Sequence, residues 1–167
     1  MFELQDVKYS ADGKGILALD ELKLEGKKSV MLLGPSGCGK TTLLQIMAGI
    51  RKADEGSVKF DGTDLHALKR KALDQFRGRN FGFVFQNFHL LRHLSVKDNI
   101  RLAAMGAKLT VNEDKTTALL DNFGLRDKVG QQVSSLSQGE AQRVAIARAV
   151  ANDPKVIFAD EPTSALD

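Results

Sequence analysis

The sequence predicts an α/β fold built on a parallel sheet. Short apolar runs at residues 29–33, 81–85 and 156–159 alternate with longer stretches of helical period. The last run, "VIFA", is apolar throughout, as is typical of a parallel strand that is covered on both faces. Alternation of strands with helices is the pattern of α/β domains.

The elements follow one another in a consistent order. "SVMLL" at 29–33 is expected to be a strand, and the apolar residues of "TTLLQIMAGI" then share one helical face, with Gly49 at the C-terminal cap. "SVKFDG" predicts a strand that runs into the Asp61–Gly62 turn. "FGFVF" at 81–85 predicts a second buried strand.

Three later helices have recognisable ends. Ser95, Thr110 and Ser137 each precede an acidic residue by three positions, which is the spacing of a capping box. The second helix should end at Gly124, and the third near Ala151, where "NDP" breaks it.

Composition limits the class of protein. The chain has 167 residues, 43% of them hydrophobic and 27% charged, which fits one globular domain. Its net charge of +3 is spread along the chain, so we expect no nucleic-acid partner. Cys38 is the single cysteine, which fits a reducing compartment. No apolar run approaches the ~20 residues that span a bilayer, so we expect no direct membrane insertion.

A glycine-rich loop carries the strongest chemical signal. "GPSGCGKT" at 34–41 matches G-x-x-x-x-G-K-[ST] between a predicted strand and a predicted helix. Glycines let backbone N–H groups surround an anion, and the helix N-terminus adds a positive dipole. Lys40 can reach the β- and γ-phosphates, and the Thr41 hydroxyl can bind Mg²⁺. The alternative is a Gly-rich turn without a ligand, with Cys38 as a small loop residue.

An acidic pair follows the last strand. Asp160 and Glu161 come at the C-terminal end of "VIFA", the edge of an α/β sheet where ligands bind. Nucleotide hydrolysis needs Mg²⁺ held and a water molecule deprotonated. We assign the first task to Asp160, through water, and the second to Glu161. The alternative is a pair of solvated acids in a turn.

Together the motifs resemble the nucleotide-binding domain of an ABC transporter. "GPSGCGKTT", "FVFQ", "LSQGEAQRVAIARA" and "VIFADEPTSALD" occur in that order, and the resemblance covers nearly the whole chain. "FGFVFQNFHLL" and "FADEPT" are most similar to the ATPases of lipoprotein-release and macrolide-type exporters. The resemblance implies a P-loop NTPase (RecA-like) parallel sheet core, a small N-terminal antiparallel β part and a helical subdomain. The core would comprise 1–86 and 152–167, and the helical subdomain 87–151.

The resemblance also implies roles for single residues. Tyr9 would stack on adenine, with an ordinary strand aromatic as the alternative. Gln86 would sense Mg²⁺ and the attacking water, and would face a transmembrane partner. The catalytic set would be Glu161, Gln86 and Lys40, and the metal set Thr41, Gln86 and Asp160. The phosphate-binding set would be Gly34, Ser36, Gly37, Cys38, Gly39, Lys40, Thr41 and Thr42.

Ser137 and Gly139 lie in the signature motif, which in this family closes over ATP held by a second subunit. A helix N-terminus capped by Ser137 can present donors to a γ-phosphate. Gln138 and Glu140 depart from the commonest LSGGQ form. Asp167 would belong to a loop that crosses the dimer interface.

The rest of this helix has a simpler interpretation. Val144, Ala147 and Val150 are expected in the core, and Arg143 and Arg148 in surface ion pairs.

The implied partners are a second copy of the ATPase and an integral-membrane permease. ATP and Mg²⁺ would be the cofactors, and the location would be cytoplasmic, on the inner face of the plasma membrane. The family's site has a further strand and a His after "SALD", so we expect the chain to be a piece of a longer ATPase. The alternatives are a non-transport ABC ATPase and an ATP-binding fragment without turnover.

Overall fold

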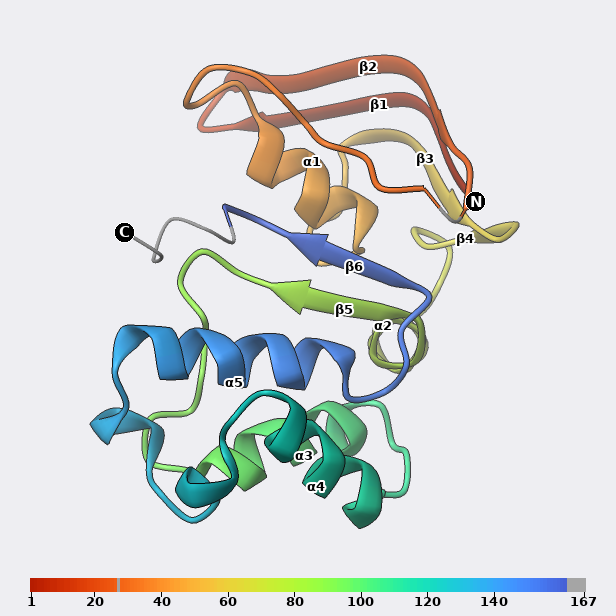
Figure 1. The fold of residues 1–167 in the computed structure, drawn as a ribbon. Helices are drawn as coiled ribbons and strands as arrows, with labels where there is room; N and C mark the ends of the chain where they lie inside the picture. Colours follow the sequence, from red (N-terminus) through yellow and green to blue (C-terminus); the bar gives the residue numbers. More distant parts are fainter. Residues whose placement is uncertain (27, 162–167) are drawn as a thin grey trace. The chain divides into compact units, whose positions relative to one another are not determined.

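The computed structural model describes residues 1–26 and 28–161 and divides the chain into two units, Met1–Leu73 and Asp74–Asp167 (Figure 1). The division into 1–86 with 152–167 and 87–151 stays a prediction. No helix in the described ranges is long and apolar enough to cross a membrane.

The first unit is built on an antiparallel sheet of order β2-β1-β3-β4. Its strands are β1 (Phe2–Ala11), β2 (Lys14–Leu24), β3 (Glu55–Phe60) and β4 (Thr63–Asp64), and its helix is α1 (Lys40–Met47). Phe2 and Leu4 on β1 and Val58 and Phe60 on β3 are buried at alternate positions, so one face of this part of the sheet carries the core. Asp61 and Gly62 both have positive φ, which confirms the predicted turn between β3 and β4.

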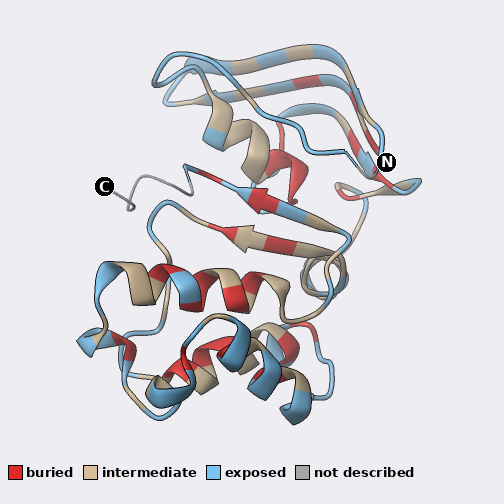
Figure 2. Cartoon of the chain, in the orientation of Figure 1, coloured by how far each residue is buried: buried red, intermediate tan, exposed pale blue. Residues whose placement is uncertain are grey.

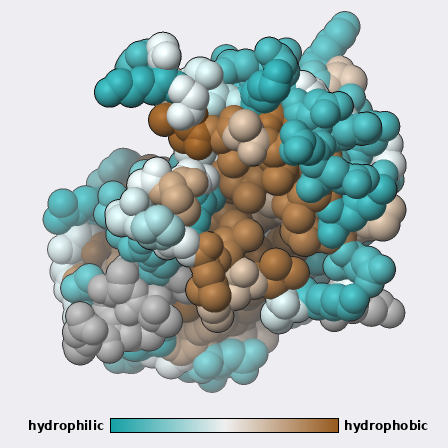
Figure 3. Space-filling model, turned by 90° about the horizontal axis from the view of Figure 1, so that it is seen from above, coloured by the Kyte–Doolittle hydropathy of each residue, from teal (hydrophilic) through white to brown (hydrophobic). Residues whose placement is uncertain are grey.

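The prediction of a strand at residues 29–33 is wrong. This segment is in no strand, and Val30, Met31 and Leu33 are 53%, 79% and 83% exposed. An isolated strand leaves its backbone groups without partners, and no described strand pairs with this one. Figure 3 shows one face of the molecule, on which hydrophobic residues, in brown, gather within a hydrophilic rim.

The second unit contains a pair of parallel strands. β5 (Phe81–Val84) pairs with β6 (Val156–Ala159) in register from Phe81↔Val156 to Val84↔Ala159, which confirms both predicted strands. The expectation that β6 is covered on both faces is wrong, because Phe158 is buried while Ile157 is 51% exposed. β6 has a described neighbour on one side only.

Helices form the rest of this unit. They are α3 (Val96–Gly106), α4 (Glu113–Asn122), the short η1 (Arg126–Lys128) and η2 (Val133–Ser135), and α5 (Gln138–Val150), while α2 (Arg70–Asn80) begins in the first unit. Their shared core appears as red positions along α3 and α5 (Figure 2). It consists of Val96, Ile100, Leu120, Leu125, Val144 and Ala147.

Gly82 brings α5 close to β5. A Cβ at this position would lie 2.2 Å from the carbonyl oxygen of Ala149, so only glycine allows the approach. The helix that begins at Ser137 therefore packs directly against the strand that leads to Gln86.

Two of the three predicted helix starts are confirmed. Ser95 and Ser137 cap α3 and α5, and Ser137 forms a complete capping box with Glu140. The helix start predicted at Thr110 is wrong, because α4 is capped by Asn112. The Asn112 side chain accepts a hydrogen bond from the Lys115 N–H at 2.9 Å. Asn is as good an N-cap as Ser or Thr, and it directly precedes the acidic first turn of α4.

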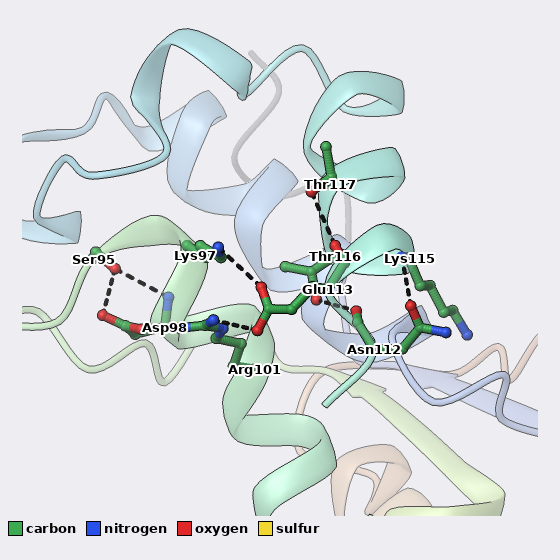
Figure 4. A network of polar contacts seen from close by, with 9 residues as sticks. All are labelled: Ser95, Lys97, Asp98, Arg101, Asn112, Glu113, Lys115, Thr116 and Thr117. Atoms are coloured by element: carbon green, nitrogen blue, oxygen red, sulfur yellow. Dashed lines mark hydrogen bonds and ion pairs between the residues drawn. The ribbon is translucent and has the colours of Figure 1, made fainter. Parts of the chain in front are cut away.

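A polar network joins the start of α3 to the start of α4 (Figure 4). Glu113 accepts from Lys97 at 2.9 Å and from Arg101, and Arg101 also contacts Asp98. Asp98 in turn accepts from the Ser95 hydroxyl at 2.6 Å. One carboxylate from α4 thus holds two cations of α3.

Acid is expected to weaken this junction through Glu113. Hydrogen bonds from Lys97 and then Arg101 hold the pKa of its carboxyl below the ordinary value. Such a group stabilises the fold above its unfolded-state pKa, and the contribution disappears as pH falls through the lowered pKa. Urea unfolding should find Glu113→Gln slightly less stable than wild type at neutral pH and equal to it in strong acid. A difference that does not change with pH would contradict this.

Candidate functional site

The glycine-rich loop of the first unit is shaped for an anion. Gly37 and Gly39 have φ of 80° and 93°, a region that L side chains rarely adopt. Gly39 is the N-cap of α1 and offers no side-chain oxygen to its N–H groups, and the first turn of α1 contains no acid. A phosphate could therefore take the place of a capping side chain at this helix N-terminus.

Lys40 lies across the same loop. Its Nζ donates to the carbonyl oxygens of Gly34 and Pro35, both at 2.9 Å, and lies 3.9 Å from the Cys38 sulfur. Thr41 and Thr42 follow in the first turn of α1. These lysine contacts are exposed, so water can replace Nζ at the two carbonyls when the ammonium turns to a bound anion.

Tyr9 has a partner that the sequence did not single out. It lies on β1 opposite Leu17, and the Arg51 guanidinium lies 4.8 Å from its ring centroid and donates to its hydroxyl. A cation over the face of a half-exposed tyrosine is a cation–π contact. Arg51 therefore covers one face of the ring, and stacking of Tyr9 on adenine stays a prediction.

In the second unit, the parallel pairing of β5 and β6 brings distant residues together. Asp160 is buried directly after β6, and its N–H donates to the Val84 carbonyl at 3.0 Å. The next residue, Glu161, has φ of 46° and accepts a 2.6 Å hydrogen bond from Gln86 Nε2. The structure thus unites two of the three predicted catalytic residues.

This contact fits the roles predicted from the sequence. A carboxylate that accepts a hydrogen bond from an amide is held in one orientation, and a carboxylate is a group that can accept a proton from water. No cluster of three His, Cys, Asp or Glu side chains occurs in the described part of the chain. Mg²⁺ at a nucleotide needs none, since phosphates, water and one or two protein oxygens complete its shell.

The signature motif opens α5. The Ser137 hydroxyl donates to Glu140 at 2.9 Å, and the Ser137 N–H donates to the same carboxylate at 2.8 Å. These bonds, the backbone one first, lower the pKa of the Glu140 carboxyl. Gly139 lies in the first turn of this helix. Glu140, which stands where the commonest form of the motif has Gln, therefore preserves the N-terminal cap of α5.

The remaining expectations for α5 are mixed. Val144 and Ala147 are fully buried, which confirms them as core, and Val150 is half-buried. The ion pairs expected for Arg143 and Arg148 are wrong, because neither pairs with an acid among the described residues. Arg148 donates instead to main-chain carbonyls, an arrangement that no local sequence pattern reveals. Asp167 lies outside the described residues.

The comparisons with known proteins agree with these features. The family model described as ABC transporter matches residues 18–164. "Lipoprotein-releasing system ATP-binding protein LolD" of Bacteroides thetaiotaomicron is 40% identical over 169 residues, which cover all of this chain and 78% of that protein. The Bacteroides fragilis protein of the same name is 39% identical with the same coverage.

A solved structure gives the same result. The dimeric post-hydrolysis state of the ATP-binding cassette MJ0796, bound to ADP and Pi, superposes with a TM-score of 0.90 at 33% identity. The match covers all of this chain and 76% of that one. The phosphate loop, the Gln86–Glu161 contact and the capped signature helix thus occur in a chain that belongs to the ABC transporter family of ATP-binding proteins.

Proposed function

We propose that this chain binds and hydrolyses Mg-ATP as the ATPase subunit of a transporter that acts on lipoproteins or similar exported cargo. The observation that carries the proposal is the 2.6 Å hydrogen bond from Gln86 to Glu161 at the carboxyl ends of β5 and β6. A phosphate loop alone supports binding. A positioned carboxylate supports hydrolysis as well.

The residues divide the work. Gly34, Ser36, Gly37, Cys38 and Gly39 form the loop whose N–H groups would hold the phosphates. Lys40 would turn from its two carbonyls to the β- and γ-phosphates, and Thr41 and Thr42 would support them from α1. Tyr9 would stack on the base.

Glu161 would accept the proton of the attacking water, while Gln86 keeps its carboxylate in place. Thr41, Gln86 and Asp160 would hold Mg²⁺, which neutralises charge on the phosphates when it is bound. The proton would move from the water oxygen to a Glu161 carboxylate oxygen as the bond to the γ-phosphorus forms and the bond to the leaving oxygen breaks.

Two copies are proposed to act together. Ser137 and Gly139 at the start of α5 would contact ATP that is held by the loop of the other copy, as a capped helix N-terminus can. The MJ0796 cassette is dimeric with ADP and Pi. The proposed dimer would work on an integral-membrane permease at the inner face of the plasma membrane.

The function is tested by phosphate release from ATP by the full-length protein, with Mg²⁺ and with EDTA. We expect turnover with Mg²⁺ and none with EDTA. Binding of a fluorescent ATP analogue without phosphate release would favour a nucleotide-binding role alone. Co-purification with a permease separates a transport ATPase from a soluble member of the family.

A further inference from the structure

Arg148 is a cation with unusual surroundings. Its guanidinium donates to the carbonyl oxygens of His89 at 2.8 Å and Phe88 at 2.7 Å, and no described acid pairs with it. The side chain is half-buried, and burial lowers the pKa of its guanidinium. A charge that is partly removed from water and meets only neutral acceptors is costly. If the side chain at 148 served only to pack against its neighbours, an apolar residue would stabilise the fold more.

The two carbonyls lie just after Gln86. His89 has φ of 47°, and its ring contacts the Phe85 ring edge-on at 4.7 Å between centroids. The segment from 85 to 89 therefore turns sharply, and two of its carbonyl oxygens accept from one guanidinium. Arg suits this geometry because its planar fork donates in two fixed directions.

The far end of the loop is held by a second side chain. Asn99, fully buried on α3, accepts from the Leu91 N–H at 2.9 Å and donates to the Leu91 carbonyl at 3.0 Å. The loop is thus fixed by α3 at one end. At the end next to Gln86 it is fixed by α5.

We propose that Arg148 is a positioning residue for ATP hydrolysis, which holds the loop after Gln86 so that the Gln86 amide stays in contact with Glu161. This inference rests on the proposed function. It also gives α5 a direct connection to the catalytic carboxylate, because the helix that begins at Ser137 carries Arg148 near its other end.

The first test is a double-mutant cycle in the full-length protein. Because small misplacements of a catalytic group reduce rates strongly, Arg148→Met should lower kcat about 10- to 100-fold. The KM for ATP should change little, since the phosphate loop belongs to the first unit. Arg148→Lys, which keeps the charge but not the fork, should recover part of kcat.

The decisive comparison uses Gln86→Ala. If Arg148 acts through Gln86, the variant that combines Arg148→Met with Gln86→Ala has the same kcat as Gln86→Ala alone. Arg143→Met serves as the matched control, since Arg143 is exposed on the same helix, and it should keep wild-type kcat. The inference would be overturned if the fold-reductions in kcat of the two single variants multiplied in the double variant, or if Arg148→Met kept wild-type kcat.

A second readout does not depend on turnover. Amide hydrogen exchange of residues 87–91 in nucleotide-free protein should be faster in Arg148→Met than in Arg143→Met, while α3 keeps its protection. Unchanged exchange in this loop would also overturn the inference. If wild type itself releases no phosphate, the proposed function fails instead, and the exchange measurement still tests the contact.

Discussion

Glu161→Gln is expected to slow phosphate release about 10²- to 10⁴-fold, the usual contribution of a general base. The amide has the shape of the carboxylate and can still accept from Gln86, which lies 2.6 Å from Glu161 in the wild type. It cannot take a proton from water at neutral pH. Binding of ATP should persist, because the phosphate loop is unchanged, so ATP should accumulate on the protein.

The control for this variant is Glu113→Gln. It makes the same chemical change in the second unit, at the junction of α3 and α4. At neutral pH it should hydrolyse ATP at the wild-type rate. Single-turnover assays would measure both variants, and a wild-type rate in Glu161→Gln would remove Glu161 from the role of base.

Lys40→Met should weaken ATP binding about 10- to 150-fold, which corresponds to the ~1.5–3 kcal/mol of a hydrogen bond to a charged group. Met keeps most of the side-chain length but has no charge to offer a phosphate. The fold should tolerate the change, since the Gly34 and Pro35 carbonyls that Nζ contacts are exposed to water. Isothermal titration with ATP would measure the affinity.

Lys14→Met provides the comparison for Lys40. Lys14 is exposed at the start of β2 in the same unit, and its replacement should leave the affinity for ATP unchanged. Equal weakening in the two variants would mean that net charge, and not the position of Lys40, determines binding.

Local patterns predicted the elements that depend on neighbouring residues. The apolar runs at β5 and β6 predict strands. Ser95 and Ser137 predict helix starts, because the hydrogen bonds of a cap are made within four residues. The same rule failed at Thr110 because Asn112, two residues later, is an equally good cap. Residues 29–33 have a strand-like composition, but a strand also needs a partner, and no local pattern shows one.

The candidate site was predictable where side chains form motifs. Gln86 and Glu161 were each assigned to catalysis, and the parallel register of β5 and β6 explains how they meet. The sequence predicts only a surface ion pair for Arg148 and no role for Asn99, because both side chains bind main-chain carbonyls or N–H groups. Every residue has such groups, so the sequence carries no signal for the pairing.

The central claim is that the phosphate loop of one copy works with the signature helix of another. Mixing Lys40→Met protein with Ser137→Arg protein tests it most directly. Each variant alone should release little phosphate, since one lacks the lysine and the other blocks the helix start. A mixed dimer contains one intact loop facing one intact signature, so phosphate release should rise to a maximum at equal amounts of the two. If the mixture shows only the average of the separate activities, the site does not form between copies and the claim is wrong.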